Sequence, residues 1–422
     1  MSYFRIWRTL FRYWRSDLLA GITVGIVALP LALGFAITTG APASAGLSTA
    51  IIAGFVAALF GGSNYQVSGP TGAMTVVLVP IVARYGLQSL VLLGITAGAI
   101  IIAASLLRLG KWIDSVPWSV MEGFTLGIAL IIALQQIPLI FDVQKAAGTH
   151  TFSVAVATLR SALSSPLHWS SISLAISTVV IKRGWPVLKS KLGIPIHIPG
   201  SIVAITVMTL VSRLLSLDVA RIGELPRSIS FTGNFSMADM PLSAFLYSAF
   251  VIAALGAIES LLSARVADGM ARKEIGHDQT PHDPNKELFG QGLATIASAA
   301  MSGLPATGAI ARTTVNVHAG ARSRLASIIH SLFLLLVVLV LAPVVSLIPT
   351  AALAGVLLGT SLRIATPRSI AEALRTTYEI RLVYVVTAIS VLMIDLIWGT
   401  VIGIALHVAL KRWKRKSPRE RN

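Results

Sequence analysis

Two short hydrophobic stretches, far apart in the chain, are interrupted by glycine and proline in a matching way. Residues 68–76 read SGPTGAMTV, and residues 305–315 read PATGAIARTTV. A matched pair of this kind predicts two helices that begin inside a membrane rather than at its surface. The fold depends on how the rest of the chain surrounds these two segments.

The composition indicates that the surroundings are lipid. Hydrophobic residues make up 55% of the 422 residues, charged residues 12%, and the mean hydropathy is +0.80. A soluble protein carries about 25% charged residues, so these values exclude an ordinary soluble enzyme and a disordered chain. The chain has no cysteine, which excludes disulfides, thiolate metal sites and a cysteine nucleophile.

Hydrophobic segments follow one another along almost the whole chain and predict an all-α polytopic membrane protein with fourteen spans. Several are shorter than the about 20 residues that a full crossing needs. The expected spans are 18–38, 46–61, 70–84, 89–107, 116–140, 169–181, 196–216, 242–266, 287–302, 309–319, 325–345, 348–361, 380–396 and 399–411. Residues 1–17, in which arginines alternate with aromatic residues, are expected to form an amphipathic helix on the membrane surface rather than a signal peptide.

The net charge of +17 follows from membrane topology. The Lys and Arg residues lie between the hydrophobic segments and at both ends, and no exposed basic domain is expected that could bind nucleic acid. With fourteen spans and a cytoplasmic N-terminus, the great majority of these residues lie on the cytoplasmic side, as the positive-inside rule requires. We expect an integral protein of the bacterial inner membrane with both termini in the cytoplasm.

The two interrupted segments are the third span of each half of the chain. Seven spans are an odd number, so the second half enters the membrane from the opposite side and the repeat is inverted. The expected division is a first repeat at 18–216, a linker at 217–241, a second repeat at 242–411 and a basic tail at 412–422.

The interrupted segments predict an anion site. A helix that starts in mid-membrane presents unpaired N–H groups and the positive end of its dipole, which suits a small anion. Pro70 is tolerated in a first helical turn, and Gly72 and Gly308 allow a ligand to approach the backbone closely. Arg312 adds a full positive charge, and a buried arginine requires a function or a partner.

A carboxylate lies deep in the eighth span. About fourteen apolar or small residues precede Glu259, and Ser263 follows one turn later on the same face. Together with backbone carbonyls, this pair could hold a sodium ion. Alternatively, Glu259 alone could carry a proton, or it could be a structural partner of Arg312.

Nucleotide-binding and hydrolase motifs do not occur in a suitable context. We therefore expect neither an enzyme nor a cofactor.

Several ordered motifs resemble those of the sulfate permease (SulP) family of anion transporters over nearly the whole chain. They are ALPLALGFAITTGA in the first span, SGPTGAMTVV in the third, GFTLGIAL in the fifth, LGAIESLLSARVADGM in the eighth, NKELFGQGLA entering the ninth and GLPATGAIARTTVNVHAGARSRLA around the tenth.

The resemblance implies a seven-plus-seven inverted repeat with a core domain and a gate domain, which is usually dimeric. It places the anion at the starts of spans three and ten, with an aromatic residue of the first span nearby. It also implies that Glu259 and Ser263 occupy the positions that bind sodium in sodium–bicarbonate members. The implied anion contacts are Phe35, Thr71, Gly72, Ala73, Gly308, Ala309, Ile310, Ala311 and Arg312.

The chain departs from the family in three places. The family usually carries a cytoplasmic regulatory domain of the STAS type, and we expect the membrane part alone here. The sodium-coupled members have Asp at the position of Glu259 and Thr at the position of Ile310, which favours a proton over sodium. The loop HDQTPHDPNKEL also differs from the usual asparagine-rich version.

Together these features predict a secondary active transporter that works by alternating access. Its substrate is expected to be a small inorganic or carboxylic anion: bicarbonate, sulfate or a dicarboxylate. Coupling is expected to H⁺ or Na⁺ through Glu259. Two alternatives remain open: a nucleobase permease of similar architecture, which Arg312 disfavours, and an anion channel, which Glu259 disfavours.

Overall fold

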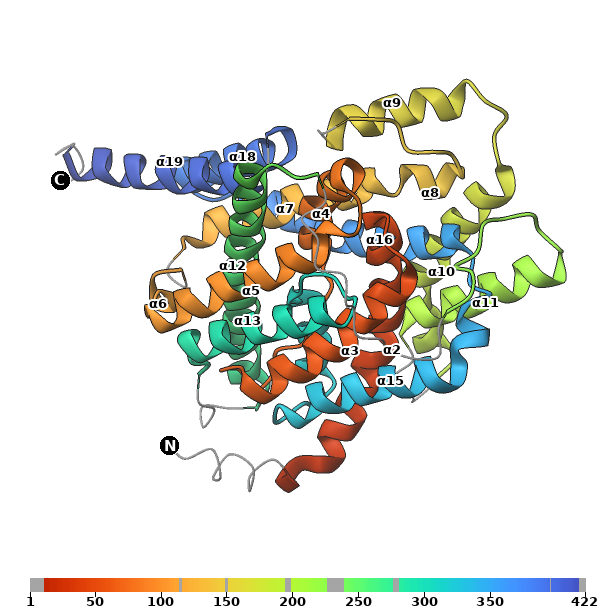
Figure 1. Cartoon of the computed structure of the whole chain (residues 1–422), viewed down its shortest axis with the longest axis horizontal. Helices are drawn as coiled ribbons and strands as arrows, with labels where there is room; N and C mark the ends of the chain where they lie inside the picture. The colour runs from red at the N-terminus through yellow and green to blue at the C-terminus, as the bar shows by residue number, and fades with distance from the viewer. Residues whose placement is uncertain are drawn as a thin grey trace.

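The computed structural model describes residues 11–113, 116–148, 151–193, 199–225, 239–275, 281–394 and 396–416, and the chain is overwhelmingly helical (Figure 1). The first half contains η1 (Phe11–Tyr13), α2 (Trp14–Thr39), α3 (Ala43–Phe60), β1 (Ser68–Gly69), α4 (Gly72–Tyr85), α5 (Ser89–Leu106), α6 (Gly110–Ile113), α7 (Trp118–Gln135), α8 (Ile137–Phe141), α9 (Thr151–Leu163), α10 (Trp169–Lys191) and α11 (Gly200–Leu214). The second half contains α12 (Leu242–Ile275), α13 (Pro284–Ala300), β2 (Thr307–Gly308), α14 (Ile310–His318), α15 (Leu325–Val345), α16 (Thr350–Ile364), α17 (Pro367–Leu374), α18 (Tyr378–Met393) and α19 (Leu396–Lys416).

Proline fixes where several of these helices begin. α3, α7, α11 and α16 each start directly after a proline in extended conformation. Proline lacks an N–H and has a fixed φ, so it interrupts a preceding helix but tolerates a following one. α13 begins with Asp283 as its N-cap, whose side chain accepts hydrogen bonds from the amides of Asn285 and Lys286, and with Pro284 in its first turn.

The described helices have the length and surface of a membrane protein. Seven of them are long and apolar enough to cross a bilayer: α2, α3, α5, α7 with α8, α12, α15 and α19. Large apolar side chains are exposed along α15 at Leu332, Leu336, Leu339 and Val340. An exposed apolar face of this extent indicates contact with lipid.

The helices pack in two groups. α2, α3, α4, α5, α12, α13, α14 and α15 pack mainly on one another, whereas α7, α10, α11, α16, α18 and α19 form a second group. Within the first group α5 packs against α13 as α15 packs against α3, and in Figure 1 α5 and α13 run side by side. Within the second group α7 packs against α18 as α16 packs against α10. Each of these pairs therefore joins a helix of the first half of the chain to a helix of the second half.

The all-α prediction needs one correction. β1 and β2 form a two-stranded antiparallel sheet in which Ser68 pairs with Gly308 and Gly69 with Thr307. The two interrupted segments thus pair with each other through their backbones. Extended backbone must satisfy its N–H and C=O groups inside a membrane, and this pairing supplies part of that.

Each of the fourteen expected spans coincides with a helix, but several bounds differ. α10 continues to Lys191 and α12 to Ile275, because both helices extend past their apolar part into basic residues. The expected surface helix at 1–17 is wrong in its last residues, since Trp14–Asp17 are the first turn of α2; residues 1–10 lie outside the described part. Residues 412–416 of the expected tail belong to α19.

Candidate functional site

The site is built around the crossing of the two interrupted segments. Directly after the paired strands, α4 begins at Gly72 and α14 at Ile310. The amide of Ala309 donates to the carbonyl of Val67 at 2.9 Å, which extends the contact beyond the strands. The two helix starts predicted from the sequence are therefore brought together.

Both helix starts leave amides unpaired. Thr71 caps α4, and its hydroxyl accepts a hydrogen bond from the amide of Met74 at 3.3 Å. Within the described residues, the amides of Gly72, Ala73, Ile310 and Ala311 have no hydrogen-bond acceptor, as expected for the first turns of helices. Unpaired N–H groups at two adjoining helix starts form a region of positive potential.

Arg312 reaches from the second interrupted segment to the first. It lies in the first turn of α14 and is buried, at 1% exposure. Its Nη2 atom donates to the carbonyl of Pro70 at 2.6 Å, whereas Nη1, packed against the backbone of Gly69, has no hydrogen-bond partner in the described ranges. The guanidinium therefore has an unused donor and, within the part of the chain that the structure describes, no carboxylate within ion-pair distance.

Glu259 on α12 connects to both segments through two hydroxyls. Its Oε2 atom lies 2.9 Å from Thr71 Oγ1 and 2.7 Å from Thr307 Oγ1, and the two hydroxyls lie 3.1 Å apart. The neighbouring Ser260 accepts a hydrogen bond from the amide of Gly308 at 3.0 Å. The Glu259 carboxylate therefore contacts one hydroxyl from each of the two interrupted segments.

Ser263, one turn further along α12, points to a different partner. Its hydroxyl lies 3.1 Å from Thr313 Oγ1, which also accepts a hydrogen bond from the amide of Val67 at 3.1 Å. Glu259 and Ser263 therefore do not hydrogen-bond to each other. The oxygens that gather around Glu259 are those of Thr71 and Thr307, and Thr307 was not singled out from the sequence.

Two apolar side chains cover the start of α4. A Cβ atom placed on Gly72 would lie 3.3 Å from Phe35 Cε1 and 2.1 Å from Ile132 Cδ1. Phe35 of α2 therefore lies beside the start of α4. Ile132 comes from α7 in the second group of helices, and no sequence signal distinguishes it from the other apolar residues of that span.

Ile310 at the start of α14 opens onto a cavity of about 260 Å³. Its walls come from both helix groups, because α12 and α14 contribute Leu262, Val266 and Ile310, while α7 and α18 contribute Met121, Glu122 and Tyr384. Glu122 accepts a hydrogen bond from Trp118 Nε1 at 2.8 Å within this wall. The cavity therefore extends to the start of α14.

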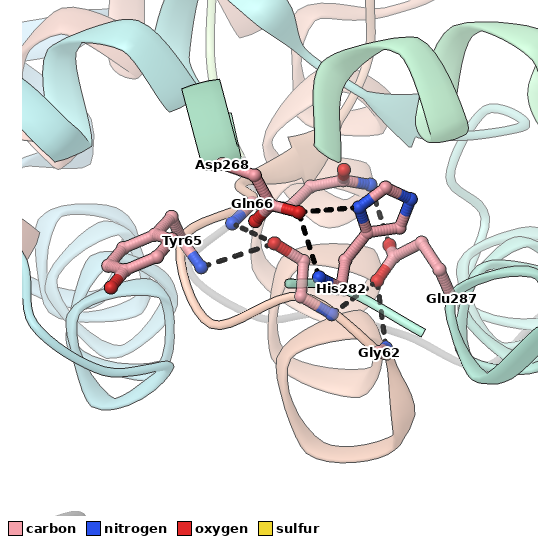
Figure 2. Close-up of polar contacts among 7 residues, drawn as sticks. Gly62, Tyr65, Gln66, Asp268, His282 and Glu287 are labelled. Atoms are coloured by element: carbon pink, nitrogen blue, oxygen red, sulfur yellow. Dashed lines mark hydrogen bonds and ion pairs between the residues drawn. The ribbon is translucent and has the colours of Figure 1, made fainter. Parts of the chain in front are cut away.

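A second polar cluster, drawn in Figure 2, lies next to the crossing. Glu287 in the first turn of α13 accepts hydrogen bonds from the amides of Gly62 and Ser63, each at 2.8 Å, and from Gln66 Nε2 at 2.7 Å. Gln66 in turn packs on Gly308, where a Cβ atom would lie 2.2 Å from Nε2. Glu287 therefore holds the side chain against which β2 is packed.

In the same cluster, Asp268 and His282 join the end of α12 to the start of α13 (Figure 2). Asp268 Oδ2 lies 2.7 Å from His282 Nδ1 and accepts the amide of His282 at 2.8 Å. These contacts fix the segment that precedes Glu287. Sequence reasoning missed this cluster, because its members come from α12, the loop before α13, α13 itself and residues 62–66, and only the fold brings them together.

Comparisons with known proteins show the family to which the chain belongs. The sequence profile of the "Sulfate permease family" matches residues 14–387. The Bacillus subtilis (strain 168) protein "Putative sulfate transporter YvdB" is 35% identical over 400 residues, which cover 93% of this chain and 72% of that protein. "Bicarbonate transporter BicA" of Synechocystis sp. is 33% identical over 406 residues, covering 93% and 69%.

A solved structure has the same fold over nearly the whole chain. It is described as the transmembrane domain of a cyanobacterium bicarbonate transporter, BicA, and superposes with a TM-score of 0.82 at 31% sequence identity. The match covers 94% of this chain and 98% of that one.

Proposed function

Since this chain belongs to the sulfate permease family, we propose that it is a secondary active transporter that moves a small oxyanion across the membrane. It is an integral membrane protein of a transporter family and not an enzyme.

The observation that carries the proposal is the environment of Arg312. A buried guanidinium with an unused Nη1 donor lies beside two helix starts with unpaired amides. Burying a charge without a partner is costly, and an arriving anion would offset that cost. The proposed anion contacts are Phe35, Thr71, Gly72, Ala73, Gly308, Ala309, Ile310, Ala311 and Arg312.

Sulfate and bicarbonate are the substrates we propose first. The relatives that this chain resembles are described as transporters of these two anions. Phe35 and Ile132 close over Gly72 and leave little room beside α4, which favours a compact oxyanion over a longer dicarboxylate. Saturable uptake of labelled sulfate or bicarbonate into proteoliposomes tests this, with a nucleobase as the competitor that should have no effect.

Alternating access would move one helix group against the other. Ile132 on α7 packs on Gly72 at the start of α4, and the cavity at Ile310 takes its walls from both groups. Sliding of the two groups would therefore cover or uncover the anion site. The packing of first-half helices on second-half helices in corresponding pairs supports an inverted repeat of 18–216 and 242–411, joined by 217–241.

We propose Glu259 as the coupling residue, with a proton as the coupling ion. The hydroxyls of Thr71 and Thr307 lie at hydrogen-bond distances from Glu259 and from each other, an arrangement that suits a carboxyl group gaining or losing a proton. Sodium at Glu259 and Ser263 is the alternative, although the Ser263 hydroxyl is turned toward Thr313. We also propose that the protein forms homodimers in the bacterial inner membrane, with both termini in the cytoplasm.

A further inference from the structure

A second cavity lies away from the crossing, between the two helix groups. Its volume is about 680 Å³, and its walls come from α2 and α14 on one side and from α10, α11 and α16 on the other. It begins at Thr314 and Val315, one turn beyond Arg312 on α14, and extends toward the basic ends of α10 and α16. Its lining is therefore separate from that of the crossing.

Three cations line this cavity from two helices. Lys182 and Lys189 lie two turns apart on one face of α10, and Arg363 continues the face of α16 formed by Val356 and Thr360. His318 lines the opposite wall. The lining contains no aspartate or glutamate among the described residues.

Lys182 has only neutral hydrogen-bond partners among the described residues. Its half-buried ammonium donates to the carbonyl of Val356 at 2.6 Å and to Thr360 Oγ1 at 2.5 Å, both of which are neutral. Within the described ranges, Lys182, Lys189 and Arg363 have no carboxylate within 4 Å. An ammonium has three donors, so Lys182 retains one for a ligand in the cavity.

We propose that this cavity is a second anion site, which binds a sulfate- or phosphate-type group with two or more negative charges through Lys182, Lys189 and Arg363. Several cations around one space match a polyvalent oxyanion better than a monovalent one. Its volume far exceeds that of one such group, so the group can belong to a free anion or to an anionic lipid headgroup whose chains follow the apolar part of the wall.

Trp185 lies between the two lysines in the lining and provides a local reporter. The protein, purified in neutral detergent, is titrated with sulfate and with pyrophosphate while tryptophan fluorescence is recorded. The expected result is a saturable change that disappears in Trp185→Phe. A parallel arm compares nanodiscs of neutral lipid with nanodiscs that contain an anionic phospholipid, which identifies a headgroup as the source if only that lipid produces the change.

The charge variants decide the assignment. Lys182→Gln, Lys189→Gln and Arg363→Gln should each weaken binding by about ten-fold or more, as expected for loss of a charge-assisted hydrogen bond. Arg183→Gln is the matched control, because Arg183 is an exposed cation of the same helix that does not line the cavity. Lys182→Gln keeps an N–H donor for Val356, which protects the fold.

The second site does not rest on the transport proposal, and the two fail separately. Arg312→Gln should leave the Trp185 signal unchanged while it impairs uptake. Absence of a Trp185-dependent signal with both free anions and anionic lipid would overturn the second site, as would equal weakening by Arg183→Gln. Loss of the signal in Arg312→Gln would also overturn it, because the anion detected would then be bound at the crossing.

Discussion

Arg312 Nη2 lies 2.6 Å from the carbonyl oxygen of Pro70, so a charged side chain of one interrupted segment ends on the backbone of the other. This contact places a full positive charge between the starts of α4 and α14. Because Nη1 has no hydrogen-bond partner among the described residues, the same residue both joins the two segments and offers a donor to a ligand.

Arg312→Ala should weaken anion binding by about one to two orders of magnitude, because a hydrogen bond to a charged group contributes about 1.5–3 kcal/mol. Equilibrium binding of labelled sulfate or bicarbonate to purified protein measures this. Arg312→Lys keeps the charge and should retain part of the affinity. Arg213→Ala, at an exposed arginine of α11, is the control and should bind normally. Unchanged affinity in Arg312→Ala would remove Arg312 from the site.

Glu259→Gln should abolish gradient-driven accumulation and spare anion exchange, because the amide keeps the size of the side chain but cannot take up a proton. Uptake driven by a pH gradient and uptake driven by a sodium gradient separate the two coupling ions, and wild-type uptake should follow the pH gradient. Glu372→Gln at an exposed position of α17 is the matched control. Uphill uptake at the wild-type rate in Glu259→Gln would contradict the coupling role, and strict sodium dependence with no effect of pH would contradict the proton.

Thr71→Val and Thr307→Val each remove one hydroxyl beside Glu259 with little change in shape. Because both hydroxyls lie near the same oxygen and 3.1 Å from each other, the two substitutions should be non-additive. A double-mutant cycle on pH-driven uptake should give a coupling energy of about 0.5–3 kcal/mol. Thr307→Ser should behave as wild type. Strict additivity would mean that the two hydroxyls do not share Glu259.

Gly308→Ala should destabilise the protein by about 1–3 kcal/mol, as overpacking does. The new methyl group would lie 2.2 Å from Gln66 Nε2, whose side chain is held by Glu287. Gly269→Ala in α12 is the control, since no other described residue beyond its own helical turn lies within 4 Å of the added Cβ atom, and it should be neutral or slightly stabilising. Thermal unfolding in detergent compares the two. Equal melting temperatures would show that Gln66 moves aside freely.

Asp17 is buried in the first turn of α2 and accepts the amides of Arg322 and Ser323, at 2.7 and 3.1 Å, and the Ser323 hydroxyl at 2.6 Å. Asp17→Ala should therefore lower the free energy of unfolding by about 1.5–3 kcal/mol. Asp239→Ala, at an exposed aspartate just before α12, should have little effect in the same unfolding assay. Similar losses in both variants would show that the Asp17 contacts contribute nothing specific.

Sequence reasoning identified the two interrupted segments, Arg312 and Glu259 because their signals are local. Glycine and proline mark both helix starts, and Arg312 and Glu259 stand out because a charge inside a membrane is rare. Thr307 and Ile132 carry no such charge: one is a hydroxyl residue just before the expected span at 309–319, and the other is an aliphatic residue in an apolar span. Their importance arises only from the pairing of β1 with β2 and from the approach of α7 to α4.

The same limit explains the error at the N-terminus. Residues 14–17 contain two charged residues beside Trp14, a pattern typical of an interfacial helix. Asp17 instead continues α2, because its carboxylate is satisfied by residues 322 and 323. A contact across more than 300 positions of sequence cannot be seen in local periodicity.

The most direct test of anion transport at the crossing is the initial rate of labelled sulfate and bicarbonate uptake into proteoliposomes. Wild type, Arg312→Ala and Arg213→Ala are reconstituted side by side in equal amounts. The account predicts saturable uptake of at least one of the two anions by wild type and Arg213→Ala, and strongly reduced uptake by Arg312→Ala at sub-saturating anion. Uptake that is the same in all three proteins, or nucleobase uptake without anion uptake, would contradict it.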